Sequence, residues 1–125
     1  MTDIFYTLVH FQGNQDWQPP VNMFESDEEF WIEVELAGME KDQIKVVFED
    51  GVLSISGFRK RCTQTQDYIC CQLELEYGNF YRFIKFDSPI EPSRIEAHYD
   101  KGILDIRVPK KTKFGEDLKI EEKRE

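Results

Sequence analysis

The sequence has few of the residues from which catalytic and metal sites are usually built. Its 125 residues include only two histidines, His10 and His98, and three cysteines, Cys62, Cys70 and Cys71. An odd number of cysteines without C-x-x-C spacing argues against a disulfide framework and against a zinc ribbon. Cys70 and Cys71 would point to opposite faces of a strand, so they could not readily clamp one metal. We therefore expect no metal and no other cofactor.

Motifs that accompany catalysis are also missing. The sequence contains neither a G-x-G-x-x-G nor a P-loop pattern for nucleotides, and no serine lies in a G-x-S-x-G context. Carboxylates such as Glu33 and Glu35 are two residues apart, a spacing that lines the solvent side of a strand with charge. His98 alternates outward relative to Ala97 and Tyr99, which favours a solvated surface histidine over a catalytic base. We expect that the protein is not an enzyme.

Basic residues are in the minority, with 16 Lys and Arg against 25 Asp and Glu, for a formal net charge of -9. Such a surface repels phosphate backbones and anionic lipid, so we expect neither nucleic acid nor a membrane as a partner. The basic clusters at 59–61 and 110–113 are interpreted as residues that keep loops soluble and protect sheet edges from pairing with other chains. No apolar run approaches the ~18 residues of a membrane span, and the first residues lack the features of a signal peptide. These absences predict a cytoplasmic protein.

The first part of the chain, residues 1–19, contains no lysine or arginine and is rich in aromatic and aliphatic side chains. At its end, Trp17-Gln18-Pro19-Pro20 predicts a break, because Pro20 biases Pro19 toward an extended conformation and neither proline donates a backbone hydrogen bond. We expect a short apolar arm that ends near residue 20.

Residues 20–109 alternate between apolar and polar side chains, as half-buried strands do. Phe30, Ile32, Val34 and Leu36, for example, would share one face of a strand. Strands are expected at 30–36, 44–48, 53–55, 68–75, 80–86, 95–99 and 104–108. The predicted fold class is all-β, with about seven or eight short strands whose turn signals fall at the spacing of a β-sandwich.

Two turns between these strands have a specific chemistry. Asp50-Gly51 supplies residues that tolerate positive φ in a tight hairpin, and Asp100-Lys101-Gly102 turns the chain before the last strand.

The final part, residues 110–125, is dominated by charged side chains and cannot build a core alone. Leu118 and Ile120 are two residues apart, so in an extended tail both point the same way and could enter adjacent pockets on another sheet. The alternative is a frayed tail in which two apolar residues occur by chance.

Several motifs together resemble the α-crystallin domain of small heat-shock proteins of the bacterial, archaeal and plant type. Residues 97–104, AHYDKGIL, fit the A-x-x-x-x-G-[IV]-L signature of that family and are followed by DIRVPK. The segments LAG at 36–38, GVLSISG at 51–57 and YGNFYR at 77–82 are similar to further family segments in the same order. The resemblance covers about 90 residues.

The resemblance implies an immunoglobulin-like β-sandwich that acts as an ATP-independent chaperone, or holdase, for unfolding client proteins. It also implies a homodimer formed by strand exchange between the long loop and the partner's first strand, and a higher homo-oligomer. The dimer contacts carried over from the family are Val21, Met23, Tyr68, Cys70, Gln72, Glu74 and Arg82. Arg82 is expected to pair with a carboxylate.

Two further regions follow from the resemblance. Leu118-Lys119-Ile120 is similar to the family's I-x-I motif, which docks in a groove of a neighbouring dimer; here the groove would be lined by Val46, Phe48, Ile95 and Ala97. Client binding would fall to the apolar arm, through Ile4, Phe5, Leu8, Phe11 and Trp17.

Other functions stay open at this stage. A co-chaperone with a CS domain shares the sandwich but typically lacks both the glycine signature and the aliphatic tail motif. A dedicated adaptor that binds one partner through its sheet edge and groove is the alternative from another functional class.

Overall fold

The computed structural model describes residues 15–61 and 66–111. This part of the chain forms seven strands and two short 3-10 helices, η1 (Lys41–Gln43) and η2 (Pro92–Arg94). The strands are β1 (Val21–Glu25), β2 (Glu29–Glu35), β3 (Ile44–Glu49), β4 (Val52–Arg59), β5 (Gly78–Lys85), β6 (Glu96–Asp100) and β7 (Ile103–Pro109). The all-β class expected from the sequence is confirmed.

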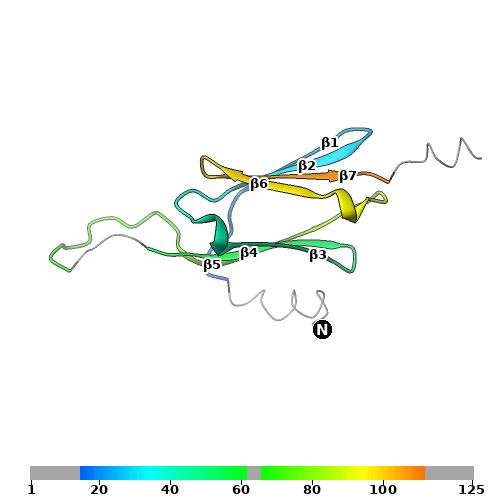
Figure 1. Cartoon of the computed structure of the whole chain (residues 1–125). Coiled ribbons are helices and arrows are strands. Elements are labelled where there is room, and N and C mark those ends of the chain that lie inside the picture. The colour runs from blue at the N-terminus through cyan, green and yellow to red at the C-terminus, as the bar shows by residue number, and fades with distance from the viewer. Residues whose placement is uncertain (1–14, 62–65, 112–125) are drawn as a thin grey trace, which may run out of the picture.

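The strands form two antiparallel sheets that pack face to face as a β-sandwich (Figure 1). One sheet has four strands in the order β1-β2-β7-β6, and the other has three in the order β3-β4-β5. Consequently β1 and β6 are the edges of the first sheet, and β3 and β5 are the edges of the second. These edges determine where another chain could add a strand.

The core lies between the sheets and follows directly from the alternation of the sequence. On β2 the side chains of Phe30, Ile32 and Val34 are buried, whereas the intervening Trp31 and Glu33 reach the outer face. The partner strand β7 contributes Leu104, Ile106 and Val108, and β4 and β5 contribute Leu53, Ile55, Phe80 and Ile84. Each fully buried side chain of this kind stabilises the fold by roughly 1.5–3 kcal/mol relative to exposure.

Both predicted turns have the backbone that their residues favour. Asp50 and Gly51 have φ of 53° and 79°, and Lys101 and Gly102 have φ of 53° and 82°. Positive φ at both central residues is typical of the two-residue hairpin turn that suits the twist of antiparallel strands. A Cβ on Gly102 would also lie 3.1 Å from the Ala37 Cα, so this position combines a backbone requirement with a close approach.

The strand expected over 68–75 is not formed in the single chain. Residues 68–77 have no strand assignment, and the segment projects away from the sandwich as the green loop of Figure 1. A strand needs a hydrogen-bonded neighbour, and among the described residues no element of the same chain lies beside this segment. The alternation in the sequence therefore describes a surface that the described part of its own chain does not cover.

Candidate interaction surfaces

The first surface is the outer edge of β1. In the described part of the chain β1 pairs with β2 alone, with Val21 opposite Val34 and Glu25 opposite Phe30. Its other edge therefore presents backbone donors and acceptors to the surroundings. Met23 and Phe24 on this strand are both exposed. Such an edge can accept one more strand.

The projecting segment is the second surface, and one of its two faces is strongly apolar. Ile69 is 91% exposed, Leu73 65% and Leu75 75%. In an extended conformation these side chains lie on the same face as Cys71, and the opposite face carries Tyr68, Cys70, Gln72 and Glu74. The residues taken from the family resemblance belong to this second, more polar face. The alternation over 68–75 places Ile69, Cys71, Leu73 and Leu75 on one face, but the dimer contacts carried over from the family did not include that face.

Arg59, at the end of β4, holds the base of the projecting segment. Its Nε donates to the Glu76 carbonyl oxygen at 2.9 Å, and its Nη1 donates to the Ala37 carbonyl oxygen at 3.2 Å. The guanidinium carbon lies 3.9 Å from the ring centroid of Trp17, a cation–π geometry. The side chain is only 12% exposed. The interpretation of Arg59 as a loop solubility residue is therefore wrong; Arg59 is a structural clamp.

Trp17, assigned to the client-binding arm by the sequence analysis, belongs to the core. It is 5% exposed, its Nε1 donates to the Gly78 carbonyl oxygen at 3.1 Å, and its ring contacts Phe80 edge-on at 5.4 Å between centroids. The preceding Asp16 makes two hydrogen bonds with Asn79: its backbone N–H donates to the Asn79 carbonyl oxygen at 2.8 Å, and its Oδ2 accepts from the Asn79 backbone N–H at 2.7 Å. Composition gave no sign of this docking. The assignment of Trp17 to client binding is corrected.

The remaining predicted arm residues, Ile4, Phe5, Leu8 and Phe11, lie outside the described residues, as do Leu118 and Ile120.

Arg82, on β5, makes a different contact from the expected one. Its Nη1 donates to the Pro19 carbonyl oxygen at 3.0 Å, so its partner within the described chain is a backbone oxygen and not a carboxylate. The side chain is half-buried, and the contact ties β5 to the residues that lead into β1.

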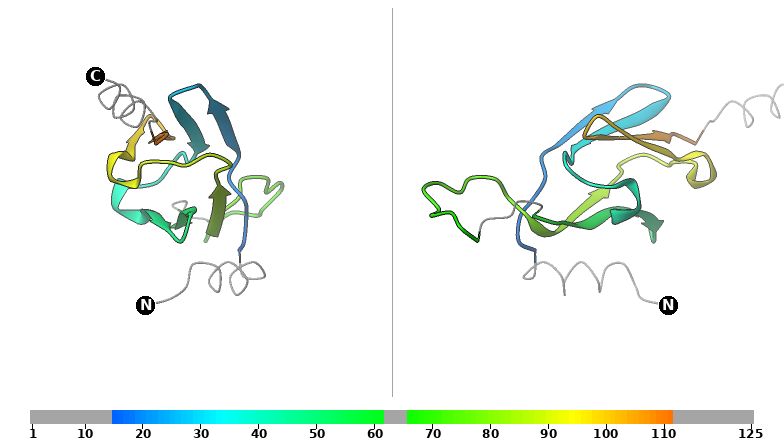
Figure 2. Two further views of the ribbon diagram at one scale, coloured as in Figure 1. Left: turned by 90° about the vertical axis from the view of Figure 1, so that its right-hand side faces the viewer. Right: turned by 60° about the vertical axis from the view of Figure 1, so that its left-hand side comes forward.

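The third surface lies along the edges β3 and β6, where the sequence analysis predicted a groove. Val46 and Phe48 on β3 and Ile95 before β6 are partly buried and pack against the core, whereas Ala97 is exposed. The end-on view shows the yellow segment before β6 and the green segment around β3 on the same side of the sandwich (Figure 2, left). Partly buried side chains thus come from both sheets, Val46 and Phe48 from the edge strand β3 and Ile95 from the residue before the edge strand β6.

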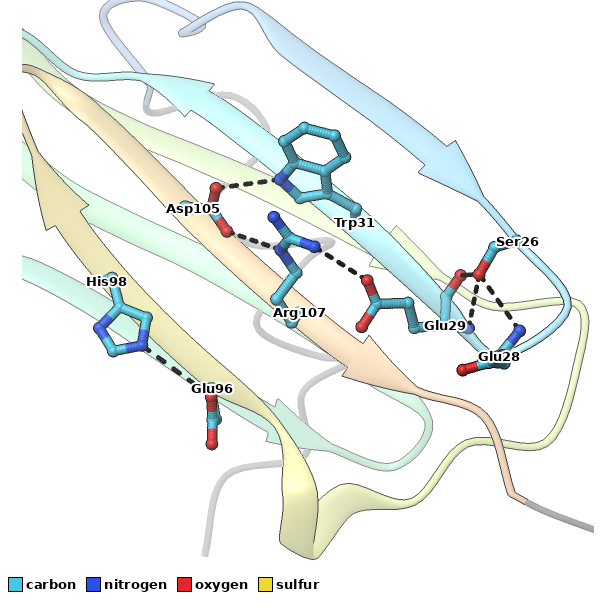
Figure 3. A network of polar contacts seen from close by, with 8 residues as sticks. All are labelled: Ser26, Glu28, Glu29, Trp31, Glu96, His98, Asp105 and Arg107. Atoms are coloured by element: carbon cyan, nitrogen blue, oxygen red, sulfur yellow. Dashed lines mark hydrogen bonds and ion pairs between the residues drawn. The ribbon is translucent and has the colours of Figure 1, made fainter.

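The outer face of the four-stranded sheet carries a polar network (Figure 3). Asp105 accepts from the Trp31 Nε1 and from the Arg107 Nε, both at 3.0 Å, and Arg107 Nη1 donates to Glu29 at 2.9 Å. The hydrogen bonds to Asp105 and Glu29 raise the pKa of Arg107 above its ordinary value. Phe24 packs on Trp31 at 5.1 Å between centroids. These contacts fix Trp31, Asp105 and Arg107 on the solvent-facing side of the sheet.

His98 lies on this same face, is largely exposed and has Glu96 4.0 Å away. Within the described ranges, no three His, Cys, Asp or Glu side chains are grouped as metal ligands would be. No helix among residues 15–61 and 66–111 is both long enough and apolar enough to cross a bilayer. What distinguishes the described surface is an open sheet edge and an exposed apolar segment, the features of a β-sandwich that associates with other chains.

Comparison with known proteins identifies the family to which this β-sandwich belongs. The Hsp20/alpha crystallin family matches residues 22–123, and the chain belongs to that family. Its members are small heat-shock proteins, which are ATP-independent chaperones rather than enzymes.

Relatives and solved structures agree with this placement. The small heat shock protein C4 of Rickettsia felis is 32% identical over 79% of this chain, which spans 61% of the length of that relative. The 18 kDa heat shock protein of Clostridium acetobutylicum is 31% identical over 93% of this chain and 76% of its own length. A small heat-shock protein structure from Xylella fastidiosa superposes with a TM-score of 0.71 at 30% identity, covering 78% of this chain and 89% of that one.

Proposed function

We propose that this chain is an ATP-independent holdase that binds unfolding proteins and limits their aggregation. The structural observation behind this proposal is the projecting segment, whose apolar face is exposed in the single chain while the β1 edge remains open; both are surfaces of the associated unit in which the holdase would act. Apolar surface kept outside a protein's own core is typical of a chain that associates with others. Membership of the Hsp20/alpha crystallin family supports the same function.

The proposed unit is a homodimer formed by reciprocal strand exchange. Residues 68–75 of one subunit add to the β1 edge of the second subunit along 21–24, and the second subunit does the same in return. Both open edges then gain backbone hydrogen bonds, and the two contacts are related by one two-fold axis. In this arrangement Ile69, Leu73 and Leu75 meet Val21 and Met23, because those two share the inner face of β1 with the core side chains opposite them.

Larger assemblies are proposed to form through the C-terminal tail. Leu118 and Ile120 would enter the groove between β3 and β6 of a neighbouring dimer, beside Val46 and Phe48. Burial of two aliphatic side chains contributes roughly 3–6 kcal/mol before the cost of ordering the tail. One tail therefore binds weakly, and several tails acting together determine the size of the assembly.

Client binding is proposed for the apolar residues of the N-terminal arm, now without Trp17. The acidic surface keeps the complex in solution, because a net charge of -9 disfavours self-association of loaded particles. The cytoplasm is the proposed site of action, and the free thiols of Cys70 and Cys71 are compatible with its reducing conditions.

The test is light scattering of two unrelated denaturing proteins, without nucleotide, titrated with the full chain. Suppression of scattering for both clients near stoichiometric ratios is expected. A Leu118→Ala/Ile120→Ala variant should form smaller assemblies and change the dose response. Lys119→Ala is the matched control, because in the extended tail that docking requires its side chain would point away from the other two.

No suppression at large excess, while the protein remains folded, would contradict the holdase. If one tight stoichiometric partner were then captured, the dedicated adaptor would replace it.

A further inference from the structure

Two neighbouring cysteines lie in the middle of the projecting segment. Cys70 and Cys71 are both free and exposed. The Cys71 thiol is 3.7 Å from the carbonyl oxygen of Ile69, within the segment itself. In the extended conformation that strand exchange requires, the two side chains point to opposite faces of the strand.

A disulfide between adjacent residues is incompatible with that conformation. Disulfides usually join residues whose Cα atoms are about 4.4–6.8 Å apart and whose Cβ atoms are about 3.5–4.5 Å apart. Adjacent Cα atoms are fixed at about 3.8 Å by a trans peptide, and in a strand the Cβ atoms diverge. Closing a ring between Cys70 and Cys71 therefore requires the backbone to leave the extended state at the centre of the exchanged strand.

We infer that Cys70 and Cys71 are a redox modification site whose disulfide form excludes the strand-exchanged dimer. The inference rests on the proposed function, because it concerns the regulation of the same exchange. The oxidant is a hydroperoxide. One thiolate attacks the peroxide oxygen, which breaks the O–O bond and gives a sulfenic acid and an alcohol or water. The second thiol displaces water from the sulfenic acid, so the two sulfurs lose two electrons in total.

The dimer and the oxidant would compete for the same residues. In the exchanged strand Cys71 shares a face with Ile69, Leu73 and Leu75, and this face turns toward the other subunit. The separated subunit exposes both thiols. Oxidation therefore acts on the separated state and shifts the population toward it, whereas a dithiol reductant restores pairing.

Sedimentation of the full chain tests this, in the reduced form and after hydrogen peroxide treatment. We expect the dissociation constant of the dimer to rise by about tenfold or more, since two lost backbone hydrogen bonds already correspond to such a change. Peptide mass mapping should find a species lighter by two hydrogen atoms, with Cys70 bonded to Cys71. Reduction should reverse both effects.

Three single variants separate the contributions of the cysteines. Cys70→Ser and Cys71→Ser, each compared with its own reduced state, should lose the response to peroxide, whereas Cys62→Ser should keep it. A disulfide involving Cys62, a disulfide between subunits, or a vicinal disulfide without any change in dissociation would overturn the inference. A reduced chain that is monomeric at all concentrations would overturn strand exchange itself, so the two failures are distinguishable.

Discussion

Replacing Trp17 with alanine is expected to destabilise the domain by about 3–5 kcal/mol, the range for removing a large aromatic from a core. The magnitude follows from its surroundings, because the ring is 5% exposed, packs on Phe80 and lies under the Arg59 guanidinium. Trp17→Phe keeps most of the apolar contact but removes the Nε1 donor to Gly78. An unsatisfied buried carbonyl costs about 1–3 kcal/mol, so this variant should be intermediate.

Urea unfolding at one fixed protomer concentration is the appropriate assay, since association would otherwise shift the midpoint. The exposed neighbour variant Gln18→Ala is the control and should change stability by less than about 0.5 kcal/mol. If Trp17→Ala cost less than about 1 kcal/mol, Trp17 would not be part of the core in solution. Its assignment to a client-binding arm would then be restored.

Two further changes test the turns and the clamp. Gly51→Ala should lower the free energy of unfolding by about 1–2 kcal/mol through backbone conformation alone, because the space around Gly51 is open. Gly102→Ala should lower it further, because the new methyl group would press on Ala37. Equal urea midpoints for the two variants would contradict this. Arg59→Ala should loosen the base of the projecting segment and speed limited proteolysis within 68–75 several-fold, with Lys45→Ala on the exposed face of β3 as the comparison. An unchanged cleavage rate would show that the clamp is dispensable.

Much of the fold could be predicted because its strands and turns are determined by residues that are neighbours in the sequence. The alternation of Phe30, Ile32 and Val34 with charged neighbours predicts a half-buried strand without knowledge of the rest of the chain. Asp50-Gly51 likewise predicts the hairpin that joins β3 and β4 from two residues alone.

The features that sequence reasoning missed depend on distant partners. Trp17 is buried because it reaches Gly78 and Phe80, about sixty positions away, and an apolar residue before two prolines gives no sign of that contact. Arg59 looks like part of a basic loop until Ala37 and Glu76 are seen to converge on it. The strand at 68–75 was expected with the correct alternation, but its hydrogen-bonding neighbour does not exist within the described chain.

Hydrogen exchange of the backbone amides of residues 68–75 tests strand exchange most directly. Within residues 15–61 and 66–111 these amides have no backbone acceptor in a strand of the same chain, and strand exchange would supply the acceptors from another chain. Strand exchange predicts protection of 68–75 and of the outer edge of β1 together, and loss of both on dilution below the dissociation constant. Exchange of 68–75 at the rate of an unprotected peptide, at a concentration where the chain is fully associated, would contradict it.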